Sequence, residues 1–245
     1  MKQSIFTVTE NTPLTKTVYR MCLAGDTSDI TVSGQFVNLL LDGFYLRRPI
    51  SVCDRAEGLL TIIYKVVGKG TAKMSAMQAG EQLDVLTGLG NGYDLSTSGD
   101  RPLLLGGGVG VPPMYLLAKD LIAQGKLVSV ILGFNTKDEI FYEDEFRALG
   151  ADVTVSTADG SYGVKGFVTD AMQQMDYTYF YTCGPEPMLK AVWNASKTSG
   201  QFSFEERMGC GFGACMGCSC KTITGYKRIC KDGPVMRKEE ILWQK

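Results

Sequence analysis

The chain has 245 residues, of which 44% are hydrophobic, a formal net charge of −1 and no histidine. The length allows two ordinary domains and a small addition, and the charge offers no electrostatic reason to expect nucleic acid or an acidic membrane surface as a partner. The absence of histidine excludes Ser-His-Asp and Cys-His catalysis, zinc sites with mixed cysteine and histidine ligands, and Rieske clusters.

The N-terminal part, residues 1–98, has the composition of short β-strands. β-branched and aromatic residues dominate the segments 5–10, 16–25, 35–41 and 59–68, and Gly, Asp or Asn residues separate these segments. Several strands at this spacing, with little helical periodicity, predict a small antiparallel β-barrel.

Residues 99–205 alternate strand and helix. The apolar run 102–108 ends in glycines and predicts a buried parallel strand, residues 114–125 predict an amphipathic helix, and residues 127–134 predict the next buried strand. Because the alternation continues to about residue 205, we expect an α/β domain with a parallel sheet and helices on both faces.

The last 40 residues, 206–245, contain five of the eight cysteines and predict a small separate metal-binding module. The segment 219–230 predicts a hairpin that turns near Gly225 and brings Cys230 back beside residues 218–220. No secretory signal is expected, because residues 1–10 alternate polar and apolar side chains. No membrane span is expected, because the longest uncharged run, 102–118, is shorter than 18 residues and broken by glycines and prolines. We therefore expect a cytoplasmic location, where cysteines indicate metal binding or redox chemistry rather than disulfides.

A glycine-rich loop follows the first predicted strand of the α/β domain. Strand, loop and helix start in this order place backbone N–H groups where a phosphate binds, and proline suits the first helical turn. The loop departs from the Rossmann pattern G-x-G-x-x-G at its last position, and a turn required only for tight packing is the alternative interpretation. The candidate phosphate-binding residues are Gly106, Gly107, Gly108, Val109, Gly110 and Pro113.

Three weaker motifs are candidates for contacts to an organic cofactor. An arginine and a serine three residues apart on an extended segment suit a pyrophosphate and a ring nitrogen, although a solvated strand end is the ordinary alternative. Gly70 and Thr71 are expected to open a helix and offer further phosphate donors. Cys183 closes a strand, where a small buried residue is equally expected. These motifs comprise Arg48, Pro49, Ile50, Ser51, Gly70, Thr71, Cys183, Gly184 and Pro185.

Asp159 follows a predicted strand of the α/β domain. A carboxylate there would accept a hydrogen bond from a ribose hydroxyl and repel a 2′-phosphate, which favours NAD over NADP. The alternative interpretation is an aspartate that begins a turn with Gly160.

The spacing C-x4-C-x2-C of Cys210, Cys215 and Cys218, with a fourth cysteine at a distance, is typical of a plant-type [2Fe–2S] cluster. Glycines between these cysteines allow the unusual backbone angles that such a loop needs. A zinc ion with four cysteine ligands is the alternative, but a second C-x2-C pair is absent. The residues alone leave Cys220 and Cys230 as competing candidates for the fourth ligand.

The segment 48–51, the glycine loop and the segment 183–188 together resemble the ferredoxin–NADP reductase family. The resemblance implies a barrel that binds FAD and an α/β domain that binds a nicotinamide dinucleotide. It further implies that Arg48 binds the FAD phosphates, that Ser51 lies near the reactive flavin nitrogen, and that Cys183 lies beside the nicotinamide.

Motifs spread over nearly the whole chain resemble the electron-transfer subunits of NAD-dependent, heteromeric (class 1B) dihydroorotate dehydrogenases; they lie at residues 46–51, 88–93, 106–113, 157–163, 205–222 and 230–235. The resemblance implies Cys210, Cys215, Cys218 and Cys230 as cluster ligands, with Cys220 outside the set. It also implies a catalytic partner subunit that carries FMN, in a heterotetramer with two copies of each subunit.

Under this resemblance, electrons pass from the partner through the [2Fe–2S] cluster and FAD to NAD. Two alternatives stay open at this point. One is a similar subunit of a hydrogenase or of a ferredoxin-dependent transhydrogenase. The other is a zinc-stabilised binding module without a redox role.

Overall fold

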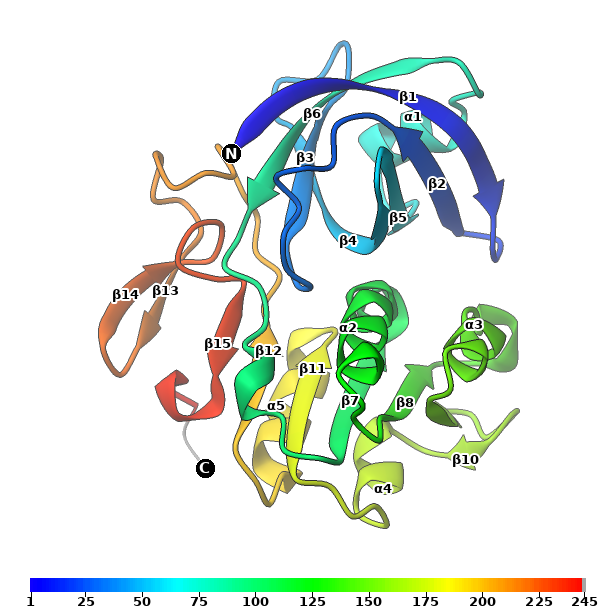
Figure 1. Cartoon of the computed structure of the whole chain (residues 1–245), viewed down its shortest axis with the longest axis vertical. Coiled ribbons are helices and arrows are strands. Elements are labelled where there is room, and N and C mark those ends of the chain that lie inside the picture. The colour runs from blue at the N-terminus through cyan, green and yellow to red at the C-terminus, as the bar shows by residue number, and fades with distance from the viewer. Residues whose placement is uncertain (244–245) are drawn as a thin grey trace.

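The computed structural model describes residues 1–243, so that positions 244 and 245 of the third predicted domain lie outside the described residues. The chain forms a barrel and a sheet with helices on both faces, and a small hairpin lies to one side near the level where the two meet (Figure 1). Within residues 1–243, no helix has the length and apolar character needed to cross a membrane.

Six antiparallel strands close the predicted barrel in the order β1-β2-β5-β4-β3-β6. The helix α1 (Lys69–Ser75) begins one residue before the expected Gly70-Thr71 pair. Alternate residues of each strand point inward, as for Phe6 and Val8 or Ile62 and Tyr64, and form the barrel core. The strands are β1 (Lys2–Pro13), β2 (Val18–Ala24), β3 (Phe36–Leu40), β4 (Arg48–Ala56), β5 (Leu59–Lys65) and β6 (Gln82–Leu89).

The α/β part is a seven-stranded sheet in the order β10-β9-β8-β7-β11-β12-β15. Leu104 packs with residues of α2 and α3 on one face, whereas Leu103 and Leu105 pack with α4 and α5 on the other face. The strands are β7 (Pro102–Gly107), β8 (Ser129–Phe134), β9 (Asp152–Thr157), β10 (Val164–Lys165), β11 (Tyr179–Cys183), β12 (Gly200–Ser203) and β15 (Val235–Arg237). The helices are α2 (Val111–Ala123), α3 (Glu143–Ala148), α4 (Val168–Met172) and α5 (Glu186–Ala195).

The C-terminal segment is joined to this sheet. Its strand β15 pairs antiparallel with β12, so the otherwise parallel sheet carries one antiparallel edge strand. The predicted hairpin is present as β13 (Ser219–Thr222) and β14 (Gly225–Arg228). The domain boundaries at residues 98/99 and 205/206 stay predictions, because β15 lies beyond the second boundary and completes the sheet that lies before it.

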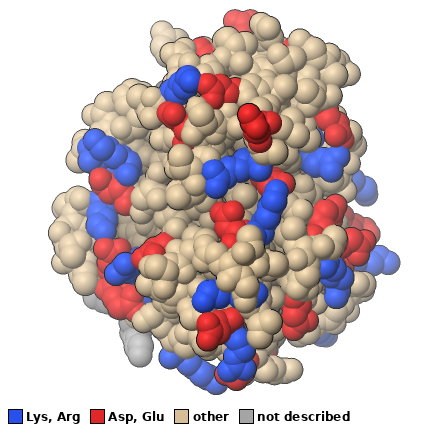
Figure 2. Space-filling model, viewed as in Figure 1, with Lys and Arg blue, Asp and Glu red and all other residues tan. Residues whose placement is uncertain are grey.

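Barrel and sheet also pack directly on each other. Helix α2 lies against β4, and Lys119 Nζ forms an ion pair with Asp54 Oδ1 at 2.8 Å. On the face of the molecule in Figure 2, basic and acidic side chains alternate, and neither sign dominates. This agrees with the nearly balanced sequence, which has 25 basic and 26 acidic residues.

Candidate cofactor-binding sites

The glycine loop connects β7 to α2 through a single 3-10 turn, Gly108–Gly110. A Cβ at Gly110 would lie 2.2 Å from the carbonyl oxygen of Cys183, and one at Gly107 would lie 2.3 Å from Met188 Sδ. Tight packing therefore explains these two glycines. Gly108 is different, because its φ is +52° and a Cβ would meet nothing within 4 Å. Its backbone is open to a ligand.

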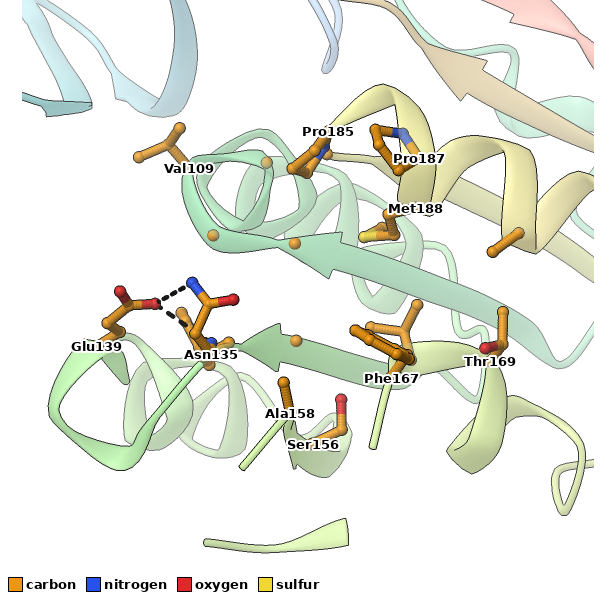
Figure 3. A pocket seen from close by; sticks show the side chains of 18 of the residues that line it. Val109, Asn135, Glu139, Ser156, Ala158, Phe167, Thr169, Pro185, Pro187 and Met188 are labelled. Atoms are coloured by element: carbon orange, nitrogen blue, oxygen red, sulfur yellow. Dashed lines mark hydrogen bonds between the residues drawn. The ribbon is translucent and has the colours of Figure 1, made fainter. Parts of the chain in front are cut away.

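A cavity of about 670 Å³ lies at the carboxyl ends of the parallel strands, where ligands of open α/β sheets bind. The glycine loop forms one wall, with Val109 and Pro185 beside it, and Asn135 and Ala158 lie across from them (Figure 3). Asn135 is held in place because its Nδ2 donates to Glu139 Oε2 at 2.9 Å. The size and position suit a dinucleotide.

The cysteine of the Cys-Gly-Pro motif is the last residue of β11 and is only 2% exposed, while Gly184 and Pro185 line the cavity. Burial raises the pKa of the Cys183 thiol, and the carboxylate of Glu205 raises it further. Cys183 is therefore a small buried residue that closes a strand, and it also lies beside the nucleotide cavity.

Besides Glu139, two charged residues that the sequence analysis did not select line the cavity. Lys65, at the end of β5, comes from the barrel, and Glu205 follows β12. The Glu205 side chain is open to the cavity, yet the surrounding protein atoms displace enough water to raise its pKa. An acidic residue two positions after a buried strand was the available signal for Glu205, whereas nothing in the local sequence distinguished Lys65.

Asp159 lies after β9 and is used within its own turn. Its Oδ1 accepts hydrogen bonds from the backbone N–H and the hydroxyl of Ser161, at 2.9 Å and 2.6 Å, and these bonds lower the pKa of the carboxyl. Gly160 follows with φ +76°, as the turn requires. The neighbouring Ala158 lines the cavity, but Asp159 is not among its lining residues. These contacts favour the turn interpretation, and the contact to ribose stays a prediction.

The predicted flavin segment is the first half of β4, where Pro49 and Ile50 pair with Asn38 and Val37 of β3. The guanidinium of Arg48 lies over the ring of Phe44, at 4.9 Å, and against Gly70, where a Cβ would be 2.4 Å from its Nε. The structure thus brings Arg48 to the start of α1.

Thr71 and Ser51 differ in how their hydroxyl groups are placed. Thr71 Oγ1 accepts hydrogen bonds from the N–H groups of Val67 and Gly68, at 2.9 Å and 3.3 Å, and so stabilises the start of α1. Ser51 pairs with Phe36 on β3 and is half-buried. Thr71 therefore has a local structural role that the sequence pattern did not indicate.

Four cysteines of the C-terminal segment lie as two pairs, Cys210 with Cys215 and Cys218 with Cys230. Cys210 Sγ accepts from Ala214 N–H at 3.2 Å, and Cys218 Sγ accepts from Cys230 N–H at 3.4 Å. Burial alone would raise the pKa of Cys210, but the N–H groups around it lower that pKa to about 6. This favours the thiolate, which is the form that binds metal.

This donor set fits a two-iron cluster. Each iron of a [2Fe–2S] unit shares two sulfides and therefore needs two thiolates, which is the number in each pair. Across residues 1–243, no three cysteine, aspartate or glutamate side chains surround a single ion position. Glycines at 211 and 213, with φ +79° and +94°, let the loop turn around the pairs.

Cys220 lies outside both pairs. It is on β13, opposite Lys227, and is half-buried against the hydrophobic core. Burial raises the pKa of its thiol, as it also does for Cys230, so position rather than pKa separates these two candidates. The hairpin brings Cys230, rather than Cys220, against Cys218.

Known proteins match this arrangement. A family model described as an oxidoreductase NAD-binding domain matches residues 104–194. The solved structure of an NADH-dependent reduced ferredoxin–NADP oxidoreductase is 31% identical, with TM-score 0.88 over 97% of this chain and 90% of that chain. A ferredoxin NADP+ reductase from Neisseria gonorrhoeae, 17% identical with TM-score 0.70 over 80% of this chain and 90% of that chain, shares the fold. The chain is an NAD-binding oxidoreductase with the reductase fold.

The other comparisons narrow this class. The model of the iron-sulfur cluster binding domain of dihydroorotate dehydrogenase B matches residues 205–242. A dihydroorotate dehydrogenase B (NAD(+)) electron transfer subunit from Fusobacterium nucleatum is 46% identical, with 98% of this chain and 99% of the relative covered. The chain belongs to the family of dihydroorotate dehydrogenase B electron transfer subunits. The resemblance predicted from the sequence motifs is confirmed.

Proposed function

We propose that this chain is the electron-transfer subunit of an NAD-dependent dihydroorotate dehydrogenase in pyrimidine biosynthesis. It carries electrons from a dihydroorotate-oxidising partner subunit to NAD. The observation that carries this proposal is the position of the two cysteine pairs beside the barrel. The loop with Cys210 lies on β3, whose neighbour β4 holds Arg48 and Ser51, and the nucleotide cavity reaches the same barrel at Lys65.

The cofactors of this function are FAD, a [2Fe–2S] cluster and NAD. When bound, FAD exchanges a hydride with NAD and single electrons with the cluster, which can hold only one. Cys210, Cys215, Cys218 and Cys230 would hold the cluster. Arg48, together with the start of α1 at Gly70, would bind the phosphates of FAD, since a guanidinium forms paired hydrogen bonds with phosphate oxygens.

The nucleotide cavity orients NAD by backbone groups rather than by acid–base chemistry. Gly108 lines the cavity at the entrance to α2, where the helix dipole favours the pyrophosphate. Lys65 adds a positive charge to the cavity from the barrel. Gly184 and Pro185, directly after Cys183, line one part of the cavity wall. Gly110 packs closely on Cys183 and so holds this part of the wall against the glycine loop.

The partner is proposed to be a catalytic subunit that carries FMN, with two copies of each subunit in a cytoplasmic heterotetramer. One feature supports a contact at the thiol pairs. Cys215 is exposed, and the neighbouring Phe212 and Met216 are 43% and 54% exposed despite their apolar character. Exposed apolar side chains around a redox centre suit a protein interface.

The test is anaerobic reconstitution of the purified chain with its catalytic partner. NADH should bleach the flavin absorption of this chain alone. Dihydroorotate should do so only when the partner is present. Full dihydroorotate oxidation by the isolated chain would contradict the division of labour, and absence of both flavin and iron–sulfur absorption would contradict the redox function.

A second candidate has one supporting observation, the 0.88 TM-score to the reduced ferredoxin–NADP oxidoreductase. Its identity to this chain is 31%, against 46% for the relative from Fusobacterium nucleatum. Reduction by ferredoxin, but not by dihydroorotate with the partner, would favour that function.

A further inference from the structure

Two asparagines attach the cysteine segment to the barrel. Asn38 belongs to β3, and Asn91 lies in the connection that follows β6. The first contacts the loop at Cys210, and the second contacts the turn 232–235, just after Cys230. The attachments therefore fall at the two ends of the segment that carries the proposed ligands.

Asn38 is 1% exposed, and its Nδ2 donates to the backbone oxygen of Cys210 at 3.3 Å. The next residue, Gly211, has φ +79°, and a Cβ there would lie 2.3 Å from the same nitrogen. The loop thus rests on the amide with no room for a side chain. Across the β3–β4 pair, Asn38 is opposite Pro49, so the proposed flavin strand lies directly beside this attachment.

Asn91 uses all of its side-chain hydrogen-bonding groups on one turn. Its Nδ2 donates to the carbonyl oxygens of Val235 at 2.8 Å and Asp232 at 3.3 Å, and its Oδ1 accepts from Val235 N–H at 3.1 Å. Its backbone N–H donates to Gly233 at 2.7 Å. The amide thereby holds this turn as a neighbouring strand would. The motif segments 88–93 and 230–235 are therefore in direct contact.

An arginine connects the two attachments. Arg228 Nε donates to Asp232 Oδ2 at 2.9 Å, inside the turn held by Asn91. Its Nη1 donates to the backbone oxygen of Gly213 at 3.0 Å, between Cys210 and Cys215. Arg228 therefore connects the turn held by Asn91 to the loop that rests on Asn38.

We propose that Asn38 and Asn91 are positioning residues that hold the two arms of the cysteine segment on the barrel, and so fix the cluster against the strand pair β3–β4. The proposal rests on the proposed function. Asn38 acts through the backbone of Cys210, and Asn91 acts through the turn after Cys230. Residues that orient metal ligands in this way change metal affinity when they are replaced, although the ligands themselves remain.

The experiment compares Asn38→Leu and Asn91→Ala with the unmodified chain, each purified anaerobically as the complex with its partner. Leucine keeps the branching of the asparagine side chain, although it is larger, and removes the donor. Each variant should lose iron to a chelator on the order of tenfold faster and show an altered reduced-state EPR spectrum. Reduction by NADH of the FAD in this chain should be unchanged. Asn194→Ala, which removes an asparagine bonded only within α5, is the matched control.

Iron release and EPR spectra equal to those of the unmodified complex in both variants would overturn the proposal. If Asn91→Ala also loses FAD, the isosteric Asn91→Asp decides, because it keeps the acceptor for Val235 and loses both donors. Unchanged iron release in Asn91→Asp would then overturn the role of Asn91. Failure of the unmodified complex to accept electrons from NADH would contradict the proposed function instead.

Discussion

Cys53, Cys183 and Cys210 show two kinds of thiol environment. Cys53 and Cys183 are enclosed by apolar side chains, and burial raises the pKa of both. Cys210 faces several backbone N–H groups, which lower its pKa to about 6 against the effect of burial. A buried neutral thiol packs as a small apolar group, whereas a thiolate binds iron.

The first prediction concerns the choice of the fourth ligand. Cys230→Ser should lose most of the cluster iron, because it removes one member of the buried pair with Cys218. Cys220→Ser, the matched control on the neighbouring strand, should retain the reduced-state EPR signal. Iron content and EPR check both variants. The opposite result would assign the fourth ligand to Cys220.

The second prediction concerns stability at alkaline pH. In the unfolded chain the Cys53 thiol ionises near its ordinary pKa of 9.0, but in the fold burial raises that pKa, so the thiol stays protonated. The folded state then binds the extra proton, and stability falls as pH rises above 9.0. Cys53→Ala removes this dependence. Above pH 9.0 the unfolding free energy of the variant should therefore fall less steeply with pH than that of the unmodified chain, by about 1.4 kcal/mol per pH unit.

Urea unfolding of both proteins between pH 8 and pH 11 measures the difference. Parallel pH curves would mean that Cys53 ionises equally in both states.

At the scale of single site residues, local patterns were sufficient for the glycine loop and the cysteine spacing. They were insufficient for Glu205 and Lys65, since these residues meet at the cavity only when barrel and sheet are packed together. For Asp159 the pattern was ambiguous, because the same aspartate that suits a ribose also suits a turn.

At the scale of elements, most strands and helices could be predicted from period and composition. The strand β4 was expected only as an extended segment, because Arg48 and Pro49 obscure its alternation. The strand β15 was not expected at all. It has only three residues, which is too short for a recognisable alternation. Its pairing with β12 joins segments that are far apart in the sequence, so no local pattern predicts it.

The third prediction concerns the junction of the glycine loop with β11. In Gly110→Ala the new methyl group would meet the backbone of Cys183, which cannot rotate away. We expect a loss of about 1–3 kcal/mol in unfolding free energy, as for other overpacked sites, with weaker NADH binding. Urea unfolding and NADH titration measure both effects.

Gly68→Ala is the control, because its φ is −171° and a Cβ there meets nothing within 4 Å. Equal behaviour of the two variants would contradict the close approach at Gly110.

At the scale of the whole molecule, the cysteine segment is attached at one end to Asn38 and at the other end to Asn91, and it connects the barrel to the sheet. Phe36 and Leu89 on the outside of the barrel pack with Cys218 and Ile229 in one hydrophobic core, which also includes Phe202 of the sheet. The three predicted parts therefore share a core. This could not be read from the sequence, where the parts appear as consecutive blocks.

The fourth prediction concerns removal of iron. Chelation should release the loop around residues 209–218, whose polar contacts include those made by sulfur. Strand β15 should stay paired with β12, because backbone hydrogen bonds and Asn91 hold it. Hydrogen exchange should therefore rise in the loop and change little in residues 201–203 and 235–237. An equal rise in both regions would contradict separate anchoring.

The pairing of β15 with β12 has a consequence for the order of biogenesis. During synthesis the barrel and six strands of the sheet leave the ribosome before Cys230 and β15 do. Until then the edge of β12 is bare, and the turn that Asn91 holds does not exist. Iron can be captured by a complete set of thiols only after these segments emerge, so the metal centre can mature only after the barrel and most of the sheet have been synthesised.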